Sequence, residues 1–382
     1  MSVTKAKTDN IISLNAAQLT GVLPAMSGAA LTGIESVTKN ASDPAIDTNP
    51  SGGVGTLWAN TTSGEMFACT DATAGENVWT NVGSGQGNVA KPFGGLGGGT
   101  VSGYTSGGQD TASNIINKFA FASNTTATDH GNITQARNGG GGHSSATQGF
   151  HSTGYVGGYK NTIDKFNFAA DATASDHGDI NNLVSTNTAC QSSTQGFVIA
   201  GNGLAGLRIK QIDKFTFATT GNATDHGDLA AIGYGMIGTS SNTDGYAAGG
   251  YTPSPKTSIE KFSFASSGNA VDLGNLSVAK GTGAGQSSTK DGYASGGYTN
   301  GPLTNRIDRH TFNSDSTATD VGDLTITRSH PAGSSSTTQG FTCGGKSPNV
   351  NTIDKFSFAT DANATDHGDL FSTISEIAGH QV

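Results

Sequence analysis

The fold is decided by one short stretch of sequence, Ile163-Asp-Lys-Phe-Asn-Phe168, which occurs six times with small changes. Side chains alternate along a β-strand, so Asp164, Phe166 and Phe168 would share one face. Two phenylalanines at this spacing suit a strand that packs between stacked sheets, and their recurrence indicates a repeated β-structure. The copies lie 46 to 49 residues apart and begin at Ile116, Ile163, Ile212, Ile259, Ile307 and Ile353.

Two further elements occur in the same six copies and in a fixed order. One is a glycine-aromatic pair that leads to Gly-Gly, with Thr153 and Ala200 replacing the first of those glycines in two copies. The other is typified by Ala223-Thr-Asp-His-Gly-Asp-Leu229. Four strand-like segments per repeat at a period of about 40–50 residues are typical of β-propellers. We therefore predict an all-β chain in which residues 87–382 form a six-bladed propeller with four-stranded blades.

Composition narrows the class of protein. The chain of 382 residues contains 57 glycines. A glycine inside a helix costs about 1 kcal/mol relative to alanine, so this composition argues against many helices. The net charge is −9 and no basic cluster offers itself to nucleic acid. Three distant cysteines form no disulfide framework. No long apolar run predicts insertion into a membrane, and the N-terminus lacks the apolar core of a secretion signal, so we expect synthesis in a cytoplasm.

The repeat resembles the kelch repeat. The order of its parts is carried by Arg137…His143, Thr153-Gly154, Ile163…Phe168 and Ala174…Ile180. Kelch repeats usually carry a tryptophan in the outer strand, where this chain has residues such as His177 instead. The resemblance covers about residues 90–382 and implies a kelch-like propeller, but a shared fold does not imply an activity.

Two segments match the innermost strand of the first blade. Residues 90–104 align with residues 136–150, and the C-terminal stretch Phe371…His380 aligns with Thr134…His143. Both cannot occupy one position, and the sequence leaves open which end of the chain closes the ring.

Residues 1–86 differ from the repeats. Residues 1–40 repeat Leu-Thr-Gly, and isolated apolar residues such as Leu19, Leu23, Leu31 and Ile34 predict an extended arm for attachment or oligomerisation. Residues 41–86 predict a small β module of two or three strands joined by a Thr-Ser-Gly turn, with Trp58 and Trp79 as its core. So small a module is expected to need a partner.

These N-terminal segments resemble parts of bacteriophage fibres and other virion appendages, and the propeller repeats are similar to those of structural proteins of aquatic phages. The resemblance implies a virion component made in the host cytoplasm, attached through its arm to other virion proteins and homo-oligomeric, with a trimer expected by analogy with fibres. The favoured function is a tail fibre or appendage whose propeller binds a host-surface glycan or receptor. The alternative is a capsid-decorating or head-fibre protein, and the third is a glycan-cleaving propeller enzyme.

The Asp-His pairs are the most tempting sign of chemistry. They occur at Asp129/His130, Asp176/His177, Asp225/His226 and Asp366/His367. Adjacent strand residues point to opposite faces, so the two members of a pair are poorly placed to act together. We predict aspartates that accept hydrogen bonds in turns and histidines that pack between blades. We therefore expect no catalytic residue, no metal site, no cofactor and no enzymatic activity.

The connection after the Gly-Gly position varies most between repeats. Variable loops on a rigid scaffold are where recognition usually lies. The six loops begin at Gln109, Tyr155, Asn202, Tyr251, Tyr298 and Lys346. We predict that Tyr155, Tyr251 and Tyr298 stack on sugar rings. Asn202, Asn300 and Asn305 would exchange hydrogen bonds with the same glycan.

Overall fold

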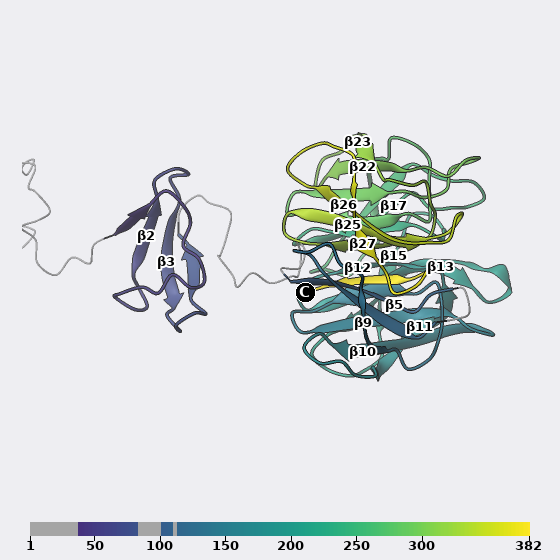
Figure 1. Cartoon of the computed structure of the whole chain (residues 1–382), viewed down its shortest axis with the longest axis horizontal. Helices are drawn as coiled ribbons and strands as arrows, with labels where there is room; N and C mark the ends of the chain where they lie inside the picture. The colour runs from purple at the N-terminus through teal and green to yellow at the C-terminus, as the bar shows by residue number, and fades with distance from the viewer. Residues whose placement is uncertain (1–36, 83–100, 110–112) are drawn as a thin grey trace, which may run out of the picture. The chain divides into compact units, whose positions relative to one another are not determined.

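A computed structural model of the chain describes residues 37–82, 101–109 and 113–382. The chain divides into two compact units, Met1–Lys91 and Pro92–Val382. Regular structure in the described residues is β-strand apart from one short 3-10 helix, η3 (Leu204–Gly206), which confirms the predicted all-β class (Figure 1). No helix in these ranges is long and apolar enough to cross a membrane. The arm residues Leu19, Leu23, Leu31 and Ile34 lie outside the described residues.

The N-terminal unit contains one four-stranded sheet. Its strands in spatial order are β1 (Thr38–Asn40), β2 (Leu57–Asn60), β3 (Met66–Asp71) and β4 (Val78–Asn81). The predicted tryptophan core is confirmed, because Trp58 and Trp79 are buried with their ring centroids 5.8 Å apart. Strand β1 pairs in parallel with β2, so this sheet takes its edge strand from the end of the range predicted as an arm.

The second unit contains four sheets of four antiparallel strands. The first is β28 (Ala378–Gln381), β5 (Ser102–Ser106), β6 (Ile115–Ala120) and β7 (Thr128–Asn132). The second is β16 (Ile237–Ser240), β17 (Asp244–Ala248), β18 (Ser258–Ser263) and β19 (Val271–Asn275). The third is β20 (Ala284–Ser287), β21 (Asp291–Ser295), β22 (Arg306–Thr311) and β23 (Thr319–Asp323). The fourth is β24 (Ala332–Ser335), β25 (Gln339–Gly345), β26 (Val350–Ser357) and β27 (Thr365–Asp369).

An eight-stranded sheet completes this unit. Its first four strands are β8 (Gly141–Ser144), β9 (Gln148–Tyr155), β10 (Tyr159–Asn167) and β11 (Ser175–Ser185). The other four are β12 (Thr188–Gln191), β13 (Gln195–Gly203), β14 (Arg208–Thr216) and β15 (Thr224–Asp228). Strands β11 and β13 are long and pair at their ends, which joins two sets of four strands into one sheet.

The C-terminal segment takes the place beside β5. Strand β28 pairs antiparallel with β5, and Ala378 lies opposite Ser106. Buried side chains fix this pairing, because the Ser106 hydroxyl lies 2.7 Å from Nε2 of His380 and 2.8 Å from Nδ1 of His151. The competing segment that begins at Ala90 falls largely outside the described residues.

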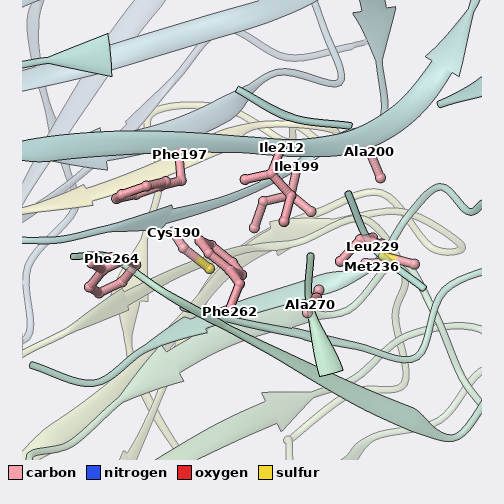
Figure 2. Packing of buried hydrophobic residues seen from close by; sticks show 11 residues of the cluster. Cys190, Phe197, Ile199, Ala200, Ile212, Leu229, Met236, Phe262, Phe264 and Ala270 are labelled. Carbon is pink, nitrogen blue, oxygen red and sulfur yellow. The ribbon is translucent and has the colours of Figure 1, made fainter. Parts of the chain in front are cut away.

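The repeated sequence elements account for the packing within and between sheets. In β9 and β10, Gly149 lies opposite Phe166, and a Cβ on the glycine would lie 2.2 Å from the phenyl ring, so this position requires glycine. Between sheets, Phe197 of β13 stacks on Phe264 with centroids 4.7 Å apart (Figure 2). The first strands of the sets contact one another in the order β8, β12, β16, β20, β24, β28 and β8 again.

Candidate functional site

A closed circuit of backbone hydrogen bonds lies where the chain turns into each first strand. One residue per repeat takes part, and its N–H donates to the carbonyl of the equivalent residue in the preceding repeat over 2.6–2.9 Å. The circuit closes because Gly139 donates to the carbonyl of Glu376. We call it the backbone ring, and its members are Gly139, Thr186, Gly235, Thr282, His330 and Glu376.

Every member of the backbone ring has a left-handed conformation, with φ between 52° and 67°. Four of the six are not glycine, and residues other than glycine rarely adopt this region of backbone conformation. Such local strain persists only when the surroundings over-determine it, and it often marks functional positions. Here the donor and the acceptor of each residue are both committed to the circuit, so the backbone is held whatever side chain it carries.

The six predicted loop-start residues surround this ring. Each pairs with the residue directly before a ring member: Asn138 with Tyr155, Ser185 with Asn202, Tyr234 with Tyr251, Gly281 with Tyr298, Ser329 with Lys346, and Ser375 with Gln109. The structure therefore brings together positions that the sequence related only by alignment. We call this surface the loop face.

One part of the loop face is aromatic. The ring of Tyr251 lies between Tyr234 and Tyr298, with centroid distances of 5.5 and 5.9 Å. Its hydroxyl donates to the carbonyl of Tyr298 over 2.5 Å, and burial, with the neighbouring tyrosines, raises the pKa of Tyr251. Because Tyr251 is only 8% exposed it supports its neighbours, whereas Tyr298 is 41% exposed. Arg208 adds a cation–π contact to Tyr234, 4.2 Å from the ring centroid.

Another part of the loop face is polar. The ammonium group of Lys346 lies 2.5 Å from the carboxylate of Glu376. Gln109, with its amide oriented to donate, lies 2.7 Å from the same carboxylate. Beside them, burial and the charge of Lys346 lower the pKa of His330 to about 3, so this imidazole is neutral at ordinary pH.

The remaining predicted site residues are placed differently from one another. Tyr155 is 43% exposed and packs edge-on against Tyr159, with centroids 5.3 Å apart. Asn300 is exposed, whereas Asn305 donates to the carbonyl of Leu324 over 3.3 Å. Asn202 is half-buried, and its side-chain oxygen has no hydrogen-bond partner in the described structure.

Sequence reasoning missed several residues of this face. Leu204 and Leu207, at the tip of the loop between β13 and β14, are 55% and 63% exposed. Tyr234 and Arg208 were also missed. The signal for Leu204 and Leu207 was present, because two leucines stand in a connection that should be polar. No sequence signal predicts the left-handed conformation of the four ring members that are not glycine.

The Asp-His pairs take the structural roles predicted for them. Nε2 of His177 donates to the carbonyl of Thr216 in the next set of strands over 2.8 Å. Its ring packs edge-on against Phe150, and burial lowers its pKa. Asp176 accepts from the N–H of Gly178 over 2.9 Å. Equivalent bonds are made by His130, His226 and His367 and by Asp129, Asp225 and Asp366. In the described parts of the chain, no group of three or more His, Cys, Asp or Glu is placed to hold a metal ion.

The chain was also compared with known proteins. No family model matches it. No curated protein shows a similar sequence. The candidate site therefore stands on its geometry and on the residues that form it.

Proposed function

We propose that the second unit is a six-bladed, kelch-like β-propeller to which the eight-stranded sheet contributes two blades. The cyclic order of contacts between first strands supports this architecture, as does the closed backbone ring. A pair of cysteines at Ser106 and Ala378, whose Cα atoms are partners across β5 and β28, should form a disulfide in the intact chain. Cys69, Cys190 and Cys343 are free thiols, so the test is the bond between the two introduced cysteines, and its absence under oxidising conditions would contradict the closure.

Within this architecture the chain is a bacteriophage virion protein, a tail fibre or other appendage, whose loop face binds a host-surface glycan or receptor. The observation that carries this function is the ring of loops, with the exposed tyrosines Tyr155 and Tyr298 on a scaffold that repeats almost unchanged. Tyrosine offers a flat surface that is apolar on its faces and polar at its tip, at little cost in conformational entropy. Variation between repeats is concentrated in these loops.

Each contact between a tyrosine and a sugar ring is weak, so tight binding depends on the number of copies of the protein on one particle. Several copies on one particle would raise the effective concentration of the remaining loop faces once the first has bound. The resemblance of residues 1–86 to fibre segments supports such a multivalent arrangement, with the arm attached to other virion proteins.

A host-glycan array with the full chain tests the proposal. Binding should be lost in Tyr155→Ala/Tyr298→Ala and kept in Val271→Ala, which removes an exposed apolar side chain from β19. Equal glycan binding by both variants would mean that the loop face is not the recognition surface. Location of the protein on intact particles separates a tail appendage from capsid decoration, and release of sugar from host polysaccharide would favour the glycan-cleaving alternative.

A further inference from the structure

Three buried histidines lie where the C-terminal strand β28 meets β5, β8 and β9. They are His143 of β8, His151 of β9 and His380 of β28, and each is fully buried. The hydroxyl of Ser106 in β5 stands between two of them, 2.8 Å from Nδ1 of His151 and 2.7 Å from Nε2 of His380. Nε2 of His143 lies 3.0 Å from the hydroxyl of Ser152 in β9. We call these five residues the histidine seam.

Backbone carbonyl groups decide where the hydrogens of the histidine seam lie. Nδ1 of His380 is 3.1 Å from the carbonyl oxygen of His143, and a carbonyl oxygen can only accept, so this Nδ1 carries the hydrogen. Nε2 of a neutral His380 therefore accepts from the Ser106 hydroxyl, whose oxygen in turn accepts from Nδ1 of His151. Nδ1 of His143 likewise donates to the carbonyl of Cys190 over 3.1 Å. The hydrogen bonds of the seam thus suit three neutral imidazoles.

The neighbouring strands present no negative charge to the histidine seam. The ring of Phe166 in β10 lies edge-on to His380 at a centroid distance of 5.1 Å, and Phe215 of β14 lies edge-on to His143 at 5.0 Å. Two titratable groups, Tyr104 of β5 and Cys190 of β12, also lie against the seam. Burial raises the pKa of each to about 12, so both stay neutral in acid.

One cation acts on the histidine seam. The guanidinium of Arg137 donates to the carbonyl of His151 over 3.2 Å, and it forms an ion pair with buried Asp164 at 3.0 Å, so this carboxylate is already neutralised. Burial, together with the charge of Arg137, lowers the pKa of His151. Burial lowers the pKa of His143 to about 3 and that of His380 to about 4. A proton on any of the three would be a buried positive charge without a counter-ion of its own.

An equivalent junction elsewhere in the second unit makes the same hydrogen bonds with residues that do not ionise. Gln286 of β20, Ser295 of β21 and Thr342 of β25 take the places of His380, Ser106 and His151. The Gln286 amide donates to both hydroxyls over 3.0 Å, and the two hydroxyl oxygens are 2.7 Å apart. Among the six first strands, only β8 and β28 carry histidine at this position. Histidine is therefore not needed to join neighbouring repeats, and it is concentrated where the two ends of the second unit meet.

We propose that the histidine seam is an acid-sensitive latch, in which protonation of the imidazoles separates β28 from β5 while the junctions made by residues that do not ionise stay paired. When β28 leaves, the imidazoles meet water and regain pKa values near 6.5. The open form then binds more protons than the closed form below about this pH, so opening becomes easier as the pH falls. The latch rests on the pairing of β28 with β5 and is independent of glycan binding by the loop face.

Hydrogen exchange of the full chain at pH 6.5 and 5.5, read by mass spectrometry and corrected for the intrinsic pH dependence of exchange, tests the latch. Over this interval each imidazole released from the seam favours opening by about five-fold, so three imidazoles give roughly 100-fold. We expect the protection of amides in β28 and β5 to fall by about that factor. Protection in β20 and β21 should fall by only about five-fold, because one imidazole, that of His310, lies against Gly292 of β21.

The double variant His151→Thr/His380→Gln gives the seam the residues of the junction that does not ionise. It keeps the hydrogen bonds and removes two imidazoles, so β28 should stay protected at pH 6.5 and lose only about five-fold at pH 5.5. His226→Leu is the matched control, because it removes an imidazole outside the seam and introduces the residue found at that position of the next repeat. It should leave the roughly 100-fold loss of protection in β28 unchanged.

Two results would overturn the latch. Equal loss of protection in β28 and in β20 would mean that acid acts on the whole second unit, and an undiminished loss in the double variant would mean that the imidazoles are not the cause. If the double variant does not fold, His380→Gln alone should lose about 30-fold, and a loss equal to that of the parent has the same meaning. Glycan binding near pH 7 is measured separately, so failure of the latch and failure of the proposed function are distinguishable.

Discussion

The backbone ring and a second closed circuit join the same six repeats by different means. In the second circuit one N–H per repeat donates to a side-chain oxygen of the next repeat over 2.5–3.1 Å. We call it the side-chain ring, and its members are Ser144, Gln191, Ser240, Ser287, Ser335 and Gln381. In the backbone ring both donor and acceptor are peptide groups, and the residues are as different as glycine, threonine, histidine and glutamate. In the side-chain ring the acceptor is a side-chain oxygen, and only serine and glutamine occur. A circuit made by the backbone leaves side chains free to vary, whereas one made by side chains restricts them. This difference explains why the variable, exposed residues gather around the backbone ring.

Thr186→Pro should break the backbone ring and give the largest effect. Proline lacks the N–H that donates to Gly139 and cannot adopt the φ of 52° found at this position. The free energy of unfolding should therefore fall by about 3 kcal/mol or more. Thr186→Gly should change stability by less than about 1 kcal/mol, since relief of the left-handed strain offsets the entropy of glycine. Urea denaturation measures both. Similar losses in the two variants would show that the threonine side chain matters.

Gly285→Ala tests the close approach of neighbouring first strands, at a glycine between the backbone ring and the side-chain ring. The new Cβ would lie 2.0 Å from a backbone oxygen that has no room to move, so we expect destabilisation of about 2–3 kcal/mol. Gly268→Ala is the matched control, because nothing lies within 4 Å of a Cβ there. Equal stability of the two variants in thermal denaturation would mean that the first strands are not packed closely at Gly285.

Ser287→Ala tests the side-chain ring at one position. The change leaves the half-buried N–H of Ser240 without its acceptor, which should cost about 1–2 kcal/mol of folding free energy. Ser123→Ala, at an exposed serine, should be neutral. An unchanged denaturation midpoint in Ser287→Ala would mean that water replaces the hydroxyl at no cost.

His310→Phe should weaken the dependence of stability on pH. Burial lowers the pKa of His310 from 6.5 to about 4, so the unfolded chain binds the proton more readily. The contribution of neutral, buried His310 to the free energy of unfolding is therefore complete above about pH 6.5. It is lost as the pH falls toward 4, by at most about 1.4 kcal/mol per pH unit. Phenylalanine occupies this position in the other five repeats. Between pH 6 and 5 the variant should lose about 1 kcal/mol less than the parent, and parallel curves would contradict this.

Much of the fold could be predicted because its signals are local and repeated. The Ile-Asp-Lys-Phe copies lie in β6, β10, β14, β18, β22 and β26. Pairing between distant segments could not be predicted in the same way. Two segments matched the position beside β5, and the structure pairs β28 there, with Ser106 in contact with His380. The pairing of β11 with β13 depends on the extra length of both strands, and no turn residue in the sequence predicts that length.

The candidate site was predictable in position but not in detail. Alignment placed the six loop starts at equivalent points, and the structure arranges them around one ring. Burial could not be predicted, since Tyr251 and Tyr298 look alike in the sequence and differ because Tyr251 is packed between two tyrosines. The left-handed turns were hidden for a different reason. Their conformation is imposed by hydrogen bonds across repeats, and Thr282 or His330 carries no local sign of it.

The pairing of β28 with β5 has a consequence for how the protein is made. Residues 378–381 are synthesised long after residues 102–106, so the edge of β5 emerges from the ribosome without its partner. An unpaired edge is a template for other strands, and contacts so distant in sequence form slowly. Nascent chains on neighbouring ribosomes would therefore be exposed to mispairing throughout translation, and a chaperone that covers this edge should raise the yield of folded protein.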